Sequence, residues 1–288
     1  SLMNYAEIAL GTWYPMGGMH EIIKGMVSLA EEKGVKIMLE HSVENIVVRG
    51  SQATGVKTSK GFIEADVVVG GADYHHIETQ LLADDEQNYS ESYWQKRTMA
   101  PSSLLFYLGV KGKVDKLTHH NLFFDEDFNL HADEIYTNPK WPSKPLFYVS
   151  APSKTDSSVA PEGDENLFVL IPIAPDLEDG EETREKYYDI VMERLERYVG
   201  HTIRDRVVYK RSFAVSDFKE EYNSFRGNAY GLANTLFQTA FLKPKLKNKK
   251  VRNLFYTGQL TTPGPGVPPS LISGLVVADV INKQYPIS

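Results

Sequence analysis

Cysteine is absent from the 288-residue chain. Disulfide bonds, cysteine-ligated metals, thiol catalysis and a cysteinyl link to a cofactor are therefore excluded. Basic residues are also in deficit, because 31 Lys and Arg oppose 38 Asp and Glu and give a formal net charge of −7. A general nucleic-acid-binding protein would carry a basic surface and a high pI, so no nucleic acid partner is expected.

Long apolar runs are lacking too, since no stretch reaches the roughly 18 residues that a membrane-spanning helix needs. The first residues show neither the basic nor the apolar region of a secretion signal. With 42% hydrophobic residues, the chain can bury the core of one large domain or two modest ones. The sequence therefore predicts a globular, cytoplasmic protein that does not span a membrane.

Two common kinds of catalytic site have no good candidates. The pairs His75-His76 and His119-His120 are adjacent residues whose rings tend to diverge, and no carboxylate follows them at metal-ligand spacing. The G-x-S-x-G turn of many hydrolases does not occur. We therefore predict neither a metal site nor a serine hydrolase.

One strongly basic run is present at Lys243–Arg252, with the sequence KPKLKNKKVR. Such a run can contact anionic lipid head groups, which would place the protein peripherally on a membrane. A solvated loop is the simpler interpretation. An anionic membrane surface is therefore one possible partner rather than a firm prediction.

The first quarter of the chain has the pattern of an α/β unit. After the pair Gly17-Gly18, apolar residues recur at helical spacing from Met19 to Ala30, and Gly34 follows as a cap. Asp66–Val69 is almost all valine, which is typical of a strand buried in a parallel sheet. The predicted strands of this region are Val35–Leu39, Val43–Arg49, Thr54–Thr58, Phe62–Glu64 and Asp66–Val69.

After Tyr74 the character of the sequence changes, because aromatic strands alternate with polar loops. One clear helix is predicted over Glu181–Val199, ending at Gly200. This composition favours a second, inserted domain of mixed sheet and helix. Its predicted strands are Leu104–Val110, Leu146–Ser150, Leu167–Ile173 and Val207–Phe213.

Near the carboxyl end the order is strand, turn, helix. Asn253–Thr257 is a short apolar run, and the Gly- and Pro-rich turn from Pro263 to Pro269 follows it. Helical spacing begins at Ser270. A helix that starts after such a turn presents unpaired N–H groups and the positive end of its dipole, which favour a phosphate or an electron-rich ring oxygen. A plain strand-to-helix connection is the alternative from geometry alone.

Five motifs in this order resemble the bacterial-type phytoene desaturases, which are FAD-dependent carotenoid dehydrogenases of the amine-oxidase-like superfamily. The motifs are YPMGG at Tyr14–Gly18, HSVENIVV at His41–Val48, VVVGGADYH at Val67–His75, GNAYGLANTLFQTAFLKP at Gly227–Pro244 and NLFYTGQLTTPGPGVPPSLISG at Asn253–Gly274. The resemblance implies an α/β fold with a discontinuous FAD/NAD(P)-binding-like domain. Residues 14–74 and 251–288 would form that domain, and residues 75–250 the inserted α+β substrate domain.

One feature of the family is missing, since no G-x-G-x-x-G turn occurs and Gly264-Pro265-Gly266 lacks the third glycine. The chain is therefore expected to be the C-terminal part of a longer enzyme, with residues 1–13 as the tail of an absent N-terminal part. That remainder of the same protein is an expected partner. FAD is the expected cofactor, bound weakly or not at all by this chain alone.

The resemblance also implies roles for single residues. A turn close to the pyrophosphate and ribityl chain would hold Gly258 and Gln259. A close approach of the backbone to the flavin would explain Gly17 and Gly18, and the backbone of Val43 would meet the adenine. For each glycine a simple turn, and for Val43 a simple core position, is the alternative. The residues expected against the isoalloxazine ring are Gly264, Gly266, Val267 and Pro268.

The implied reaction removes two hydrogens from an apolar polyene precursor, with hydride transfer to the flavin. Such a substrate offers no polar handle, so recognition requires an apolar tunnel. Gln238 either faces the flavin or binds the backbone. The sequence indicates no catalytic base. Two alternative functions remain. The protein could be a flavoprotein that saturates, isomerises or oxidises another isoprenoid or retinoid lipid, or a binding module without cofactor. The candidate tunnel residues, for which an ordinary core is the simpler explanation, are Phe225, Tyr230, Leu232, Leu236, Phe237 and Phe241.

Overall fold

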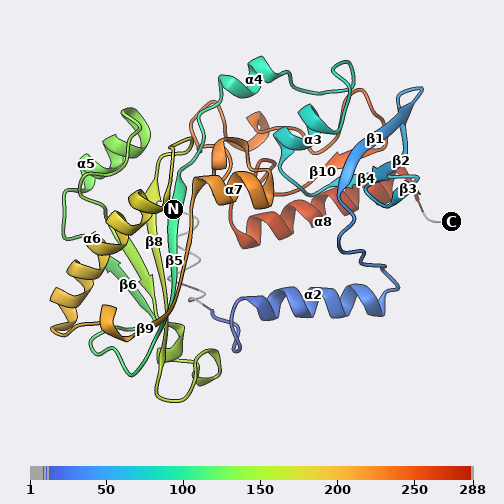
Figure 1. Cartoon of the computed structure of the whole chain (residues 1–288). Coiled ribbons are helices and arrows are strands. Elements are labelled where there is room, and N and C mark those ends of the chain that lie inside the picture. Colours follow the sequence, from blue (N-terminus) through green and yellow to red (C-terminus); the bar gives the residue numbers. More distant parts are fainter. Residues whose placement is uncertain (1–8, 10, 12, 287–288) are drawn as a thin grey trace.

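The computed structural model describes residues 9, 11 and 13–286, arranged as two lobes with one separate helix (Figure 1). The predicted tail, residues 1–13, thus lies outside the described residues except for three positions. One lobe is built on a five-stranded antiparallel sheet of order β6-β7-β8-β5-β9. Its strands are β5 (Ser102–Val110), β6 (His120–Phe123), β7 (Phe147–Ser150), β8 (Glu165–Ile173) and β9 (Val207–Phe213).

Helix α6 (Glu181–Val199) provides the other half of this lobe's core. Along β8 every second residue is buried, as expected for a strand with one covered face. The helix buries Val191 and Leu195 on one side, whereas Tyr198 is half exposed. It ends at Gly200, whose φ of +86° is the left-handed cap conformation. The prediction for this helix is confirmed at both ends.

The second lobe combines two small sheets with helices. Strands β1 (Val43–Arg49), β2 (Gln52–Thr58) and β3 (Gly61–Glu64) form an antiparallel sheet, while β4 (Val68–Gly70) and β10 (Leu254–Tyr256) pair in parallel. The β4–β10 pair therefore joins segments from before and after the first lobe. The main helices here are α3 (Tyr74–Gln80), α4 (Glu91–Gln95) and α8 (Val267–Gln284).

The core of this lobe extends beyond the expected domain boundaries at residues 75 and 250. Ile77, Trp94 and Phe225 are buried in the same hydrophobic cluster as Leu254 and Tyr256 of β10. Short helices α3 and α4 were not predicted, nor were β6, α5 (Phe128–Ala132) and α7 (Val215–Tyr222). The division into residues 14–74, 75–250 and 251–288 stays a prediction.

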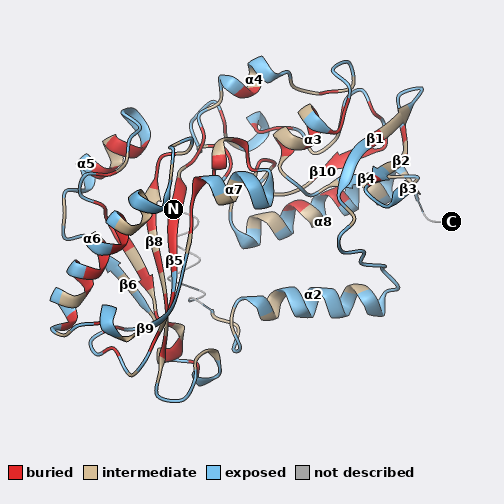
Figure 2. Ribbon diagram, in the orientation of Figure 1, coloured by how far each residue is buried: buried red, intermediate tan, exposed pale blue. Residues whose placement is uncertain are grey.

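One sequence-based expectation about the N-terminal region is wrong. Residues 35–39 form no strand in the described structure, since Val35, Ile37 and Leu39 lie exposed in a coil with no strand beside them to pair with. The predicted helix is present as α2 (His20–Glu32), but none of its residues is buried. Figure 2 shows α2 apart from both lobes with exposed residues on all sides. Its apolar stripe is thus uncovered in this chain.

Asn253 joins the two sheets of the second lobe. Its side chain is fully buried and pairs with Ala53 of β2 like a backbone amide, accepting from the Ala53 N–H at 2.7 Å and donating to the Ala53 C=O at 2.7 Å. The amide also donates to the Asp66 C=O at 2.6 Å. One side chain therefore satisfies three backbone groups between β2 and the entrance to β4.

We expect Asn253→Ala to lower the free energy of unfolding by about 2–4 kcal/mol, because it leaves buried backbone groups of Ala53 and Asp66 without partners. Asn253→Asp should lose at least as much, because it keeps the acceptor for the Ala53 N–H but places a buried carboxylate oxygen against the C=O groups of Ala53 and Asp66. Urea unfolding followed by circular dichroism measures both. A loss below about 0.5 kcal/mol in either variant, the size usual for a surface substitution, would contradict the pairing role.

Candidate cofactor and substrate site

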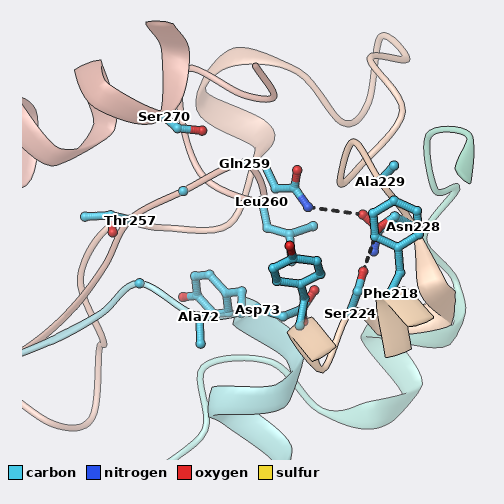
Figure 3. A pocket seen from close by; sticks show the side chains of 14 residues that line it. Ala72, Asp73, Phe218, Ser224, Asn228, Ala229, Thr257, Gln259, Leu260 and Ser270 are labelled. Atoms are coloured by element: carbon cyan, nitrogen blue, oxygen red, sulfur yellow. Dashed lines mark hydrogen bonds between the residues drawn. The ribbon is translucent and has the colours of Figure 1, made fainter. Parts of the chain in front are cut away.

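The carboxyl ends of β4 and β10 lie side by side because the two strands run parallel. Gly71, Ala72 and Asp73 follow β4, and Thr257 and Gly258 follow β10. All five line a cavity of about 470 Å³ (Figure 3). Ligands of open parallel sheets bind beyond the carboxyl ends of the strands, so this cavity occupies the expected place for one.

Gly258 lets the backbone approach this cavity closely. Its φ of +100° is a conformation that residues with a side chain rarely adopt. A Cβ placed on it would meet nothing nearer than the Gly71 carbonyl at 4.0 Å. The Gly258 N–H donates to the Ser273 Oγ of α8 at 2.9 Å, and its C=O accepts from the Thr261 N–H at 3.0 Å. The turn is thus held by two hydrogen bonds, and Gly258 itself lines the cavity.

Asp73 is a site residue that the sequence analysis did not single out. Its carboxylate caps α3 by accepting from the N–H of His75 at 2.9 Å and also accepts from the N–H of Phe225 at 3.2 Å. Burial raises the pKa of this carboxyl even though these N–H donors act in the opposite direction. A carboxylate two residues after Gly71 at a strand end was the available signal.

Asn228 is a second site residue that was missed, and its place in the Gly227–Pro244 motif was the only signal for it. It is buried, donates to the Phe225 C=O at 2.6 Å and accepts from the Gly231 N–H at 2.5 Å. Its Oδ1 also accepts from the Nε2 of Gln259 at 3.4 Å (Figure 3). The predicted residue Gln259 is therefore oriented by a loop about 30 residues earlier in the chain.

The second predicted turn continues into α8, and the helix begins earlier than expected. It starts at Val267 rather than at Ser270, so Pro268 and Pro269 lie inside its first turn. Proline has no N–H, which leaves Val267 as the only donor among the first three helical residues. The positive end of the helix dipole is present, but the several unpaired N–H groups that were expected are not. Gly264 and Gly266 have φ values of +137° and +107°.

The remaining predicted cofactor residues lie away from the cavity. The Gly17 N–H donates to the Asp156 carboxylate of the first lobe at 2.7 Å, and a Cβ on Gly18 would contact Val159. Val43 opens β1 opposite Thr58 and is exposed rather than in the core. None of these three lines the cavity. The structure thus brings Gly258 and Gln259 to one cavity, and the roles of Gly17, Gly18 and Val43 stay predictions.

A second cavity, of about 420 Å³, lies in the first lobe and has an almost entirely apolar lining. Tyr230 lines it, and the preceding residue Ala229 lines the cavity at the strand ends. The two cavities therefore share one short stretch of chain. The lining of the apolar cavity includes Phe124, Phe128, His131, Ile135, Leu146 and Tyr230.

The other candidate tunnel residues lie in different environments. Phe225 and Leu232 are buried in the second lobe's core. Leu236, Phe237 and Phe241 are about four-fifths exposed, so neither tunnel wall nor core describes them in this chain. Gln238 is buried and its amide pairs with the N–H and C=O of Thr98, which is the backbone-binding alternative. Among the residues that the structure describes, no helix is long and apolar enough to cross a bilayer.

Comparisons with known proteins give a family and a set of relatives. Residues 1–282 match the model of the family described as flavin containing amine oxidoreductase. A carotenoid 3,4-desaturase of Haloarcula japonica is 45% identical over 285 residues, which cover 99% of this chain and 57% of that protein. A zeta-carotene-forming phytoene desaturase of Myxococcus xanthus is 33% identical, over 96% of this chain and 54% of the relative. The chain thus spans just over half the length of these relatives.

Solved structures support the same fold. An oxidoreductase from Methanosarcina mazei matches 92% of this chain and 55% of its own with a TM-score of 0.63 at 14% identity. A putrescine oxidase variant matches 93% of this chain and 53% of its own, with a TM-score of 0.59 at 15% identity. At such low identity these similarities concern the fold alone, and they confirm the predicted α/β fold class.

Proposed function

The chain belongs to the flavin containing amine oxidoreductase family, and from this membership we propose that it forms part of an FAD-dependent enzyme that desaturates a carotenoid or a related apolar polyene. The observation that carries the proposal is the pairing of β4 with β10, which puts two glycine turns and an adjoining apolar cavity in one place. Its curated relatives act, by their names, on carotenoids and phytoene.

The residues at the strand ends fit part of a flavin nucleotide. Gly258 exposes backbone to the cavity, and Gln259 has an amide that can bind a hydroxyl. Gly264, Gly266 and Val267 lead into the positive end of α8, and Ser270 in the first turns of that helix lines the same cavity. These residues would hold the ring and ribityl end, and bound FAD would supply a two-electron acceptor. Weak or absent FAD binding by this chain alone is part of the proposal.

The apolar cavity suits a substrate without polar groups. His131 is its one ionisable imidazole, and both ring nitrogens are engaged within the protein: Nδ1 accepts from the Leu146 N–H at 3.0 Å, and Nε2 donates to the Pro172 C=O at 2.9 Å. Burial lowers the pKa of His131, so the ring is neutral near pH 7. The cavity therefore offers contact area without charge, as recognition of a hydrocarbon chain requires.

Two expected partners belong to the same proposal. The remainder of the protein would cover the apolar residues of α2 and α8, among which Met26, Leu29 and Leu275 are exposed. A cytoplasmic enzyme of this kind would meet an anionic membrane surface through exposed Lys245, Lys249 and Lys250. Such contact would deliver a substrate that is insoluble in water.

The test is an assay of the full coding sequence, expressed with FAD and given a saturated carotenoid precursor. We expect visible absorption to grow as the conjugated chain lengthens. Phe128→Asp, in the apolar cavity, should lower kcat/KM at least about 100-fold, because it puts a charge where the substrate lies. Val208→Asp, on the exposed face of β9, is the matched control and should change kcat/KM less than about twofold.

The outcomes separate the alternatives. Unchanged kcat/KM in Phe128→Asp would place the substrate elsewhere. A protein that binds FAD but leaves carotenoid precursors unchanged would favour action on another isoprenoid or retinoid lipid. A full-length protein that binds no FAD would favour a non-catalytic binding module.

A further inference from the structure

Lys243 differs from the other lysines of its basic run because it is buried. Its exposed fraction is 1%, whereas Lys245, Lys249 and Lys250 are exposed. The expectation of a solvated loop is therefore wrong for this residue. Within the part of the chain that the structure describes, no hydrogen-bond acceptor lies within reach of the Lys243 Nζ.

The end of the Lys243 side chain packs against the Gly264–Gly266 turn. Its Cε and Nζ lie 3.3 and 3.6 Å from the position that a Cβ would take on Gly264. Gly264 is itself buried, and three residues later α8 begins at Val267. The turn is held near Lys243 by a hydrogen bond from the Thr262 hydroxyl to the Ala240 C=O at 3.2 Å. The lysine amine thus lies against the turn that leads into the positive end of α8.

A buried amine without an acceptor is unfavourable for folding. Taking an ammonium group out of water without a partner destabilises a protein strongly, and a neutral amine still loses its hydrogen bonds to water. Burial accordingly lowers the pKa of Lys243. Nothing in the described chain compensates for this, so the acceptor has to come from a ligand or from the remainder of the protein.

We propose that Lys243 supplies the positive charge that stabilises the reduced flavin across the Gly264–Gly266 turn. This inference rests on the proposed function, which puts the isoalloxazine ring against the other side of that turn. In the desaturation the substrate loses one hydride and one proton, and the hydride brings two electrons to the ring. Because the oxidised ring is neutral, addition of the hydride gives the reduced ring one negative charge directly, while the proton from the substrate passes to water. Protonated Lys243 and the α8 dipole would oppose that charge.

Lys243 is therefore a positioning residue that tunes the flavin. Its substitution should change the reduction potential of the flavin without unfolding the protein. The test uses the full-length protein loaded with FAD and compares Lys243→Met, Lys243→Gln and Lys243→Arg, with the exposed Lys249→Met as control. The equilibrium between the flavin and a redox dye of known potential is measured by absorption. This readout does not depend on turnover of a carotenoid.

We expect Lys243→Met to shift this equilibrium at least tenfold toward oxidised flavin, which is about 30 mV for a two-electron couple. Lys243→Gln should give the same shift and serves if the methionine variant fails to fold. Lys243→Arg should stay within threefold of the parent, and Lys249→Met should not change it. Without FAD, Lys243→Met should melt at a higher temperature than the parent, because it removes a buried unpartnered amine.

Two results would overturn the inference, and they are distinguishable. FAD bound by the parent protein with an unshifted equilibrium in both neutral variants would exclude this role of Lys243 and leave the proposed function intact. Failure of the full-length parent to bind FAD would remove the proposed function, and the inference with it.

Discussion

Glu78→Leu is expected to lower the free energy of unfolding by about 2–6 kcal/mol, because it leaves two buried donors without an acceptor at about 1–3 kcal/mol each. Glu78 lies on α3 and is fully buried. Its carboxylate accepts from the Tyr256 hydroxyl of β10 and, at 2.9 Å, from the Tyr89 N–H. Tyr256 also stacks on Tyr74 with ring centroids 4.0 Å apart. This network joins the segments before and after the inserted lobe, so a loss of this size threatens the whole second lobe.

The measurement is guanidinium unfolding followed by tryptophan fluorescence, because Trp94 is packed in the same core. Glu220→Leu, at an exposed position of α7, is the control and should change the unfolding free energy by less than about 0.5 kcal/mol. If Glu78→Leu lowers the free energy of unfolding no more than this control does, the Glu78 carboxylate makes no net contribution to stability.

Glu78 also gives this prediction a dependence on pH. Burial raises the pKa of its carboxyl above the ordinary 4.5, although the hydrogen bonds from Tyr256 and Tyr89 oppose the shift. The folded state then binds a proton more tightly than the unfolded state, so its stability falls as pH rises from 4.5 through the raised folded pKa. Glu78→Leu lacks this dependence. The difference in unfolding free energy between the two proteins should therefore narrow as pH rises through that window.

Gly258→Val is expected to weaken FAD binding by the full-length protein at least about 100-fold. The residue has a φ of +100°, which a β-branched side chain resists, and it lines the cavity between the two strand-end turns, where a valine side chain would take up space. Titration with FAD, followed by quenching of flavin fluorescence, measures the dissociation constant.

Gly163→Val is the matched control for this variant. Gly163 has a φ of +85°, and a Cβ on it would meet nothing within 4 Å. The control therefore introduces similar backbone strain far from the cavity, on the Pro161–Asp164 turn of the first lobe. Similar FAD affinities in the two valine variants would mean that strain, rather than obstruction of the cavity, explains the effect. An unchanged affinity in Gly258→Val would remove this turn from the cofactor site.

Local patterns predicted much of the fold correctly. Helix α6 and strands β1 and β9 have the predicted bounds, and β2, β5 and β8 each begin about two residues before the predicted start. The family was also identified from short motifs, and the match of residues 1–282 confirms it. Each of these features depends on residues close together in sequence: a glycine cap, a period of two or of 3.6, or a glycine-rich turn.

The sequence failed where a feature depended on a distant neighbour. Val35–Leu39 has the composition of a strand but finds no strand beside it, and the apolar stripe of α2 finds no surface. Asn228 was missed because its role is to hold a loop against Gln259, which lies far along the chain. Short elements such as α3 carry too few residues for a periodic signal.

By itself, the sequence determined the family, the fold class and the glycine turns that are expected to meet a flavin, because backbone freedom and periodicity are properties of neighbouring residues. Only the tertiary structure decided that β4 pairs with β10, that Glu78 and Tyr256 share one buried network, and that the Lys243 side chain of the basic run is buried. Burial and pairing depend on which distant segments come to lie together, so the same lysine is solvated or desolvated according to contacts that no local pattern records.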